Sequence, residues 1–187
     1  MRRLPVLTHM LLGSVILTTG CMKLDFFKRP EDPVMVAKGP RIGAPAPELE
    51  GEDFDGKSFK LSDYRGKVVV VSFWASWCKP CRELIPHEQS LVQRFGDKPF
   101  ALLGVNIDDN REAALKVITT HGISWRNWRA GGEGNPIQKR WPIEALPTIC
   151  VIDADGNLRH RSSSVAHLEI AVATLLGEAE TKQRYLR

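Results

Sequence analysis

Hydrophobic residues from position 67 onward fall into two kinds of pattern. Residues 67–74, KVVVVSFW, form a run of mostly β-branched and aromatic side chains, which is typical of a central strand buried on both faces. Residues 78–95 then show recurring positions spaced three and four apart, which predicts a helix. The recurring positions are Leu84, Ile85, Glu88, Leu91, Val92 and Phe95. A buried strand followed directly by a helix is therefore the first predicted unit of the fold.

The same two patterns alternate through the rest of the chain. Residues 100–108 predict a second buried strand, and residues 110–122 predict a helix that starts with an asparagine N-cap and ends at a glycine. Residues 148–165 predict a hairpin, because strand-like runs flank the turn dipeptide Asp155-Gly156. The remaining predicted elements are an amphipathic strand at residues 123–129, a short helix around residues 137–141 and an amphipathic helix at residues 167–178.

Another hairpin is predicted before the central strand. Two strand-like runs, APELEGEDF and SFKLSDY, flank the turn dipeptide Asp55-Gly56. Strands that then alternate with helices imply a sheet with helices packed on its faces. The sequence therefore predicts an α/β fold in three layers, with a central mixed sheet flanked by helices and an N-terminal β-hairpin extension.

The first twenty residues have the composition of an export signal. Arg2 and Arg3 form a positive start, and a mostly apolar stretch of about 15 residues follows, which is short for a bilayer span. It ends in LTTGC, which resembles the lipobox of bacterial lipoproteins, although its leucine stands one place further from the cysteine than is usual. We expect a lipoprotein-type signal peptide at 1–20 and lipidation of Cys21. The alternative is an uncleaved signal anchor with an incidental cysteine.

A polar segment separates this signal from the predicted domain. Residues 21–41 contain three prolines and mixed charge without a sustained period, which predicts a tether. We expect the domain to cover residues 42–178 and residues 179–187 to form a C-terminal tail. Without Arg2 and Arg3 the formal net charge falls from +4 to +2, which is too small to indicate a nucleic-acid partner.

The four cysteines are Cys21, Cys78, Cys81 and Cys150. If Cys21 is acylated, an odd number remains, which argues against a scaffold of structural disulfides and favours one working pair with one bystander. Export places the domain where disulfides persist. Cys150 lies among isoleucine and valine in a predicted strand, so we expect it to be a buried free thiol.

Cys78 and Cys81 stand where the buried strand ends and the helix begins. Unpaired N–H groups at a helix N-terminus stabilise a thiolate, and Lys79 adds a positive charge. Pro80 suits the first helical turn because its missing N–H would have no partner there. Structural zinc would need a second pair of ligands, haem attachment would need a histidine directly after the second cysteine, and a peroxidatic cysteine would not need a couple. The pattern favours a redox couple in which Cys78 attacks and Cys81 resolves the mixed disulfide.

The motif VVVVSFWASWCKPC, with Pro86 five residues after the second cysteine and ALPT before the last predicted hairpin, resembles a thioredoxin-fold protein. The preceding hairpin narrows the resemblance to the extracytoplasmic, membrane-associated TlpA/ResA-like branch, which also resembles the AhpC/TSA group. The resemblance covers about residues 42–178. It implies that Cys78 is the nucleophile and that Pro147 is a cis-proline facing the pair. It also implies that Trp77 packs beside the disulfide and that Leu146 offers its backbone groups to the substrate. The residues expected to contact substrate are Trp77, Lys79, Pro80 and Leu146.

Two positions depart from this family pattern. Ser72 stands where thioredoxin carries a buried aspartate, and Leu84 stands where many TlpA- and ResA-like chains have a glutamate. Glu83 is one residue earlier, about 100° round the helix. We include Glu83 among the expected catalytic residues, as the proton acceptor for Cys81. The alternative is that Glu83 is an exposed first-turn carboxylate favoured by the helix dipole, with water or Lys79 taking part in proton transfer.

The predicted function is that of a thiol–disulfide oxidoreductase acting outside the cytoplasm, in redox homeostasis or cytochrome c maturation. The resemblance implies protein thiol or disulfide substrates and a membrane redox donor. We expect a lipid anchor at Cys21, and neither a cofactor nor a bound metal. The alternatives are a thiol peroxidase that uses Cys78 and a copper-binding chaperone that uses the pair with His87.

Overall fold

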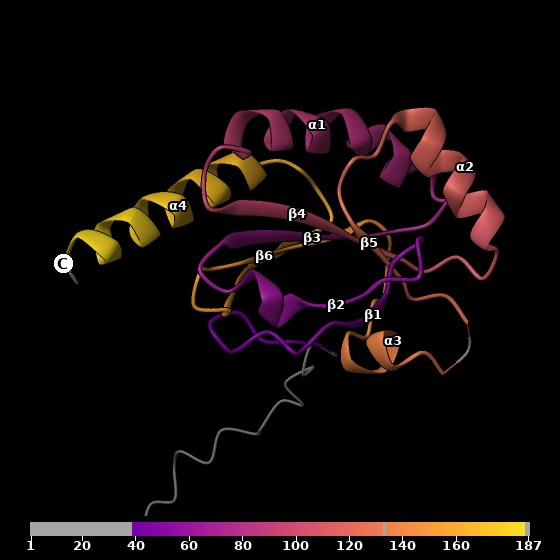
Figure 1. Cartoon of the computed structure of the whole chain (residues 1–187), viewed down its shortest axis with the longest axis horizontal. Coiled ribbons are helices and arrows are strands. Elements are labelled where there is room, and N and C mark those ends of the chain that lie inside the picture. Colours follow the sequence, from indigo (N-terminus) through magenta and orange to yellow (C-terminus); the bar gives the residue numbers. More distant parts are fainter. Residues whose placement is uncertain (1–38, 133, 186–187) are drawn as a thin grey trace, which may run out of the picture. The chain divides into compact units, whose positions relative to one another are not determined.

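A mixed five-stranded sheet forms the centre of the fold (Figure 1). The computed structural model describes residues 39–132 and 134–185, so the predicted signal peptide and Cys21 lie outside the described residues. The strand order is β5-β4-β3-β6-β7, in which β3 pairs in parallel with β4 and antiparallel with β6. Every residue of β3 is buried, as the apolar run predicted. The strands are β3 (Val68–Trp74), β4 (Phe100–Asn106), β5 (Asn127–Arg129), β6 (Thr148–Ile152) and β7 (Leu158–Ser162).

Two helices cover one face of this sheet, α1 (Lys79–Phe95) and α4 (Leu168–Tyr185) (Figure 1). A third helix, α2 (Arg111–His121), packs near the start of α1 through Ala114. The Asn110 side chain caps α2 by accepting hydrogen bonds from two backbone N–H groups, as its position in the sequence predicted. The buried side chains between the sheet and helices α1 and α4 include Val68, Val70, Leu91, Phe95, Leu102, Ile149, Val172 and Leu176.

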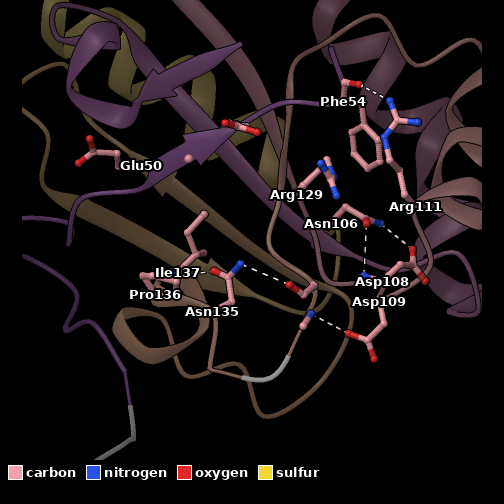
Figure 2. Close-up of a pocket in the computed structure, with 14 residues that line it drawn as sticks. Glu50, Phe54, Asn106, Asp108, Asp109, Arg111, Arg129, Asn135, Pro136 and Ile137 are labelled. Carbon is pink, nitrogen blue, oxygen red and sulfur yellow. Dashed lines mark hydrogen bonds between the residues drawn. The ribbon is translucent and has the colours of Figure 1, made fainter. Parts of the chain in front are cut away.

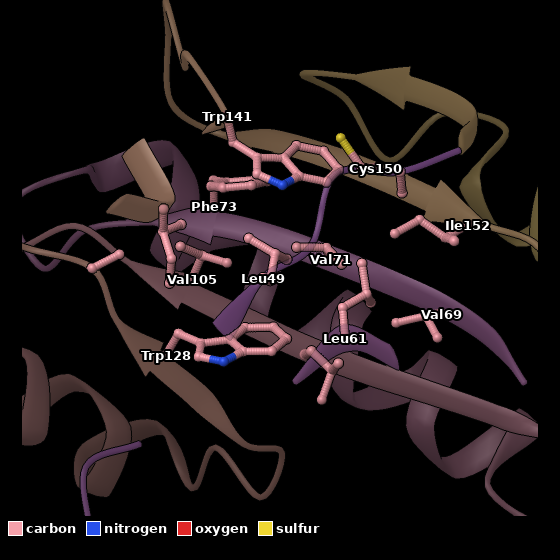
Figure 3. Close-up of a cluster of buried hydrophobic side chains, with 14 of the residues drawn as sticks. Leu49, Leu61, Val69, Val71, Phe73, Val105, Trp128, Trp141, Cys150 and Ile152 are labelled. Atoms are coloured by element: carbon pink, nitrogen blue, oxygen red, sulfur yellow. The ribbon is translucent and has the colours of Figure 1, made fainter. Parts of the chain in front are cut away.

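The N-terminal hairpin and short helical segments cover the opposite face. Figure 3 shows Leu49 and Leu61 packed against the strands together with Trp128. The Trp128 ring stacks on Phe59 with ring centroids 4.1 Å apart, and its Nε1–H donates to the Phe59 carbonyl at 3.1 Å. Trp128 therefore joins the hairpin to the edge strand β5. The covering elements are β1 (Glu50–Glu52), β2 (Ser58–Lys60), the 3-10 helix η1 (Leu61–Tyr64) and α3 (Pro136–Arg140).

The structure confirms the three-layer α/β fold with a mixed sheet and an N-terminal hairpin. Two predicted segments differ in length. The amphipathic strand expected at residues 123–129 is limited to β5, the part that pairs with the end of β4. Helix α4 continues into the residues expected to form a tail, where Glu180 contacts Lys98 at 3.2 Å and Lys182 contacts Asp155 at 2.7 Å. None of the described helices is long and apolar enough to cross a membrane.

Replacing Trp128 by alanine should lower the free energy of unfolding by about 3–5 kcal/mol, because a fully buried indole leaves a cavity. Urea unfolding of the oxidised protein, followed by circular dichroism, measures this loss. Trp77→Ala is the matched control, since Trp77 is 68% exposed, and should change stability by less than about 0.5 kcal/mol. Equal losses in the two variants would contradict the role assigned to Trp128.

Candidate active site

The end of β3 and the start of α1 position the two cysteines of the predicted couple. Strand β3 ends at Trp74 and α1 begins at Lys79. In the connecting turn the backbone N–H of Cys78 donates to the carbonyl of Ala75 at 3.1 Å. Cys78 is the N-cap of α1, and its Sγ accepts a hydrogen bond from the backbone N–H of Cys81 at 3.2 Å. An N–H group at the helix N-terminus is thus directed at the Cys78 sulfur.

Cys78 and Cys81 form a disulfide, with their Cα atoms 5.3 Å apart. The two residues are only 5% and 4% exposed, and they pack in a cluster with Phe54, Trp74 and Ala114. After reduction, the dipole of α1 favours a thiolate at Cys78, because this sulfur faces the backbone N–H group. The pair can therefore cycle between a disulfide and a dithiol.

A carboxylate that the sequence analysis did not single out holds the turn before the pair. Asp108, which follows β4, accepts hydrogen bonds from the backbone N–H of Ser76 at 2.7 Å and from its hydroxyl at 2.8 Å. Asn106 donates to the same carboxylate at 2.6 Å, and Arg82 donates to the carbonyl of Ser76. Because β3 and β4 are parallel, their carboxyl ends meet. The signal in the sequence that could have identified Asp108 is its position, just after a predicted buried strand.

The residues expected at the rim of the site are exposed. Trp77 is 68% exposed, and Lys79 and Pro80 form the first turn of α1. The Lys79 ammonium group forms an exposed ion pair with the Glu83 carboxylate at 3.7 Å. The structure thus places Glu83 on the exposed side of α1, and the proton-accepting role expected for it stays a prediction. Its exposure matches the position in the alternative stated for Glu83, an exposed carboxylate near the helix N-terminus.

The loop before β6 forms the wall beside the disulfide. The peptide bond between Leu146 and Pro147 is cis, as the resemblance implied. Leu146 packs against the cluster that contains Cys78 and Cys81. The fold thus brings together two segments that are distant in the sequence.

A second carboxyl group missed in the sequence analysis is Glu88 of α1. Its side chain is 4% exposed, and its Oε1 has no hydrogen-bond partner among the described residues. Burial raises the pKa of Glu88 to about 7, and hydrogen bonding with Ser72 of β3 opposes that rise. Glu88 lines a small cavity together with Cys81. The signal available in the sequence was an acid standing within the apolar stripe of the predicted helix.

A polar pocket of about 530 Å³ lies next to this site (Figure 2). The hairpin, the end of β4 and the segment between β5 and α3 form its walls. Arg111 donates to the carbonyl of Phe54 at 2.6 Å and so joins α2 to the hairpin. Asp108 lines the pocket and also holds Ser76. The wall of the pocket and the turn before the disulfide are therefore connected.

A mixed sheet of this order, a disulfide at the N-terminus of the helix that follows the central strand, and a cis-proline beside it define a protein of the thioredoxin fold. The chain belongs to the AhpC/TSA family, whose sequence model matches residues 42–161.

The chain is similar to proteins named thiol-disulfide oxidoreductase ResA. It is 30% identical to ResA of Bacillus thuringiensis over 117 residues, which cover 63% of this chain and 66% of that protein. It is 26% identical to ResA of Bacillus subtilis over 116 residues, which cover 62% and 64% of the two chains. The matched region thus spans slightly less than two thirds of each relative.

Solved structures have the same fold. The thioredoxin domain of a thiol-disulfide oxidoreductase from Bacteroides vulgatus has a TM-score of 0.68 at 27% identity, covering 73% of this chain and 98% of that domain. A thioredoxin-family thiol:disulfide interchange protein from Chlorobium tepidum has a TM-score of 0.63 at 28% identity, covering 71% and 96%. These similarities confirm the thioredoxin fold.

Cys150 of β6 is a free and fully buried thiol, as expected. Burial raises the pKa of this thiol to about 12, so its reactive thiolate is scarcely populated near neutral pH. Its surroundings make Cys150 part of the core rather than of the redox site.

In the reduced, folded protein, iodoacetamide at pH 8 should modify Cys78 at least about 100-fold faster than Cys150, because thiolate formation controls the reaction. Peptide mass mapping over a time course measures both rates in the full chain. Unfolding in urea should remove the difference and serves as the internal control. Comparable rates in the folded protein would contradict the distinct environments described above.

Glu88→Gln should change the pH dependence of stability in the oxidised protein. The pKa of Glu88 is raised from 4.5 to about 7 on folding, so the unfolded state loses this proton first. The contribution of Glu88 to the free energy of unfolding is complete below pH 4.5 and is lost as the pH rises to about 7. An amide does not titrate, so the stability of the variant relative to the parent should rise over that interval by on the order of 3 kcal/mol.

Urea unfolding between pH 4 and pH 8 measures this relative stability. Glu83→Gln is the matched control on the same helix and should show a nearly flat difference from the parent, since Glu83 is exposed. A flat difference for Glu88→Gln would contradict the buried environment of this carboxyl group.

Proposed function

We propose that this protein is a thiol–disulfide oxidoreductase that acts on protein disulfides outside the cytoplasm. The observation that carries the proposal is the Cys78–Cys81 disulfide at the N-terminus of α1, with the cis bond before Pro147 beside it. Membership of the AhpC/TSA family and similarity to relatives named thiol-disulfide oxidoreductase support the same activity.

The reaction transfers two electrons from the reduced pair to a substrate disulfide. The Cys78 thiolate attacks one substrate sulfur, so that a mixed disulfide forms and the other substrate sulfur leaves as a thiolate. Cys81 then loses its proton and attacks the Cys78 sulfur. The Cys78–Cys81 bond forms, and the second substrate thiolate leaves. The substrate disulfide is reduced, the two leaving thiolates take up protons, and an external dithiol restores the pair by the reverse steps.

The position of each sulfur explains this division of roles. The Cys78 sulfur faces the backbone N–H of Cys81 and lies at the positive end of α1. Cys81 lies one turn into the helix, where it lines the cavity that also contains Glu88. The thiolate is therefore favoured at Cys78, while Cys81 needs a proton acceptor before it can attack.

A protein substrate would contact the exposed residues around the disulfide. Backbone groups of Leu146 could pair with an extended substrate strand, because Leu146 lies just before the start of β6 and next to the cis bond. Trp77 offers a large exposed aromatic surface, with Lys79 and Pro80 beside it. Aromatic side chains of this kind supply much of the contact energy in protein recognition.

The N-terminal sequence supports a location at the outer surface of the cytoplasmic membrane. The export signal at residues 1–20 would direct the chain across the membrane, and lipidation of Cys21 would anchor it there through the tether at 21–41. A membrane redox donor could then return electrons to the pair. This arrangement suits redox homeostasis or cytochrome c maturation.

Replacing Cys81 by serine should trap substrates on Cys78, because the attack that releases them is lost. The full chain carrying Cys81→Ser is produced in bacterial cells, and free thiols are blocked under acid conditions. On non-reducing gels we expect adducts that disappear after treatment with dithiothreitol. Mass spectrometry should find the Cys78 peptide in these adducts.

The double variant Cys78→Ser/Cys81→Ser is the matched control and should give no such adducts. Adding Cys150→Ser to Cys81→Ser should leave the adducts in place, since Cys150 is buried. The proposal fails if Cys78 is reduced in the cell and forms no adduct with any protein.

A further inference from the structure

We propose that Glu88 exchanges a proton with Cys81 when the disulfide closes or opens. This inference rests on the proposed function and identifies the proton acceptor of the same site. Glu88 is the carboxyl group that lines a cavity together with Cys81. Glu88 is seven residues after Cys81 on the same helix.

Helix α1 places Cys81, Ile85 and Glu88 on one face. Steps of four and three residues bring successive side chains above one another on a helix. All three residues line one cavity of about 10 Å³, which is at the lower limit of the room that one water molecule needs. A proton can therefore pass between the thiol and the carboxyl group through one bridging water in this cavity.

Hydrogen bonding with Ser72 satisfies the buried carboxyl group of Glu88 only in part. The Oε1 atom of Glu88 accepts no hydrogen bond among the described residues, although the side chain is only 4% exposed. Buried polar atoms nearly always have such a partner, because an unpaired one destabilises the fold. A buried carboxyl group that keeps one oxygen unpaired and lines a cavity beside a redox-active sulfur is best explained by its chemistry.

The groups around Glu88 leave Cys81 as its titratable neighbour in the cavity. On α1 itself, His87 is adjacent in sequence but stands about 100° round the helix. Glu83 and Lys79 pair with each other on the exposed side. The groups that face Glu88 from other elements are uncharged: the Ser72 hydroxyl and the Trp74 indole of β3, and Ile123 and Trp125 after α2.

The proton balance of the exchange is simple. When the pair closes, the Glu88 carboxylate accepts the proton of the Cys81 thiol, and the new thiolate attacks the Cys78 sulfur. The proton then passes to the released substrate thiolate or to solvent. When an external thiolate opens the disulfide, Glu88 returns a proton to Cys81. A carboxyl group with a pKa of about 7 serves both directions, because both of its forms are populated near neutral pH.

A disulfide reagent with an absorbing leaving group separates the two steps. The reduced full chain, with Cys21→Ser as background, is mixed with 5,5′-dithiobis(2-nitrobenzoate). Attack by Cys78 releases one 2-nitro-5-thiobenzoate, and attack by Cys81 releases a second. The rate of the second release between pH 5.5 and pH 9.5 reports the deprotonation of Cys81.

In the parent protein the second rate should rise with pH through a midpoint near 7. This midpoint belongs to the Glu88–Cys81 pair, because the two groups interact. Glu88→Gln should slow the second release at pH 7 by at least about tenfold, and should move the midpoint to about pH 8.5 or above, where a thiol ionises unaided. Glu112→Gln, at an exposed glutamate in the first turn of α2, is the control and should keep the parent profile.

Two further variants test the inference if Glu88→Gln fails to fold. Ser72→Ala removes the hydrogen bonding that lowers the pKa of Glu88. In this variant the midpoint of the second release should therefore lie at higher pH than in the parent. Glu88→Asp keeps a carboxyl group in the cavity, so its midpoint should stay below that of a thiol acting unaided. A purely structural role for Glu88 would produce neither result.

The possible failures are distinguishable. If the parent releases the first thiolate but Glu88→Gln keeps the parent rate and midpoint, the inference about Glu88 is overturned and the proposed function stands. A Ser72→Ala profile identical to that of the parent would also overturn it. If the parent protein releases no thiolate from attack by Cys78, the proposed function itself is overturned.

Discussion

The junction between the buried strand β3 and the N-terminus of α1 is the constraint on which the rest of the site depends. All seven residues of β3 are buried in the middle of the sheet, so the point where the chain leaves the sheet is fixed. Helix α1 begins five residues after β3 ends, with a backbone N–H directed at the Cys78 sulfur. Asp108 at the end of the neighbouring parallel strand holds the intervening turn. One sulfur is thereby prepared for attack, and the other is kept inside the protein.

The helix that stabilises one sulfur also buries a carboxyl group behind the other. Because the inner face of α1 packs on the sheet, an acid on that face loses water, and its neutral form is favoured. Ser72 on β3, at the position where the resemblance to thioredoxin implies an acid, forms a hydrogen bond with Glu88. The cavity beside Cys81 therefore still holds a titratable group, but this group comes from the helix instead of from the strand. Burying the Glu88 carboxyl group destabilises the fold, and a role in proton exchange explains why the group is nevertheless buried there.

The fold and the reactive pair could be predicted from the sequence because they depend on local signals. The apolar run of β3, the Asp155-Gly156 turn and the two cysteines at a strand-to-helix boundary each determine structure over a few residues. Glu88 could not be assigned in this way, since its burial depends on β3 and on the segment after α2. The periodic pattern of the predicted helix already placed Glu88 on the inner face. Glu83 was expected to be the acid because it is next to the position where related chains have a glutamate, but it lies on the exposed side. Asp108 likewise needed the parallel pairing of β3 and β4 to reveal its contacts with Ser76.

The most direct test is a titration of the Glu88 side-chain carboxyl carbon by nuclear magnetic resonance, with selectively labelled glutamate assigned through Glu88→Gln. In the oxidised protein the Glu88 signal should titrate with a pKa of about 7. In the reduced protein its curve should change, because the Cys81 thiol then titrates in the same cavity. A Glu88 signal that titrates near the ordinary value of 4.5 in both redox states would contradict the link between the buried carboxyl group and the redox pair.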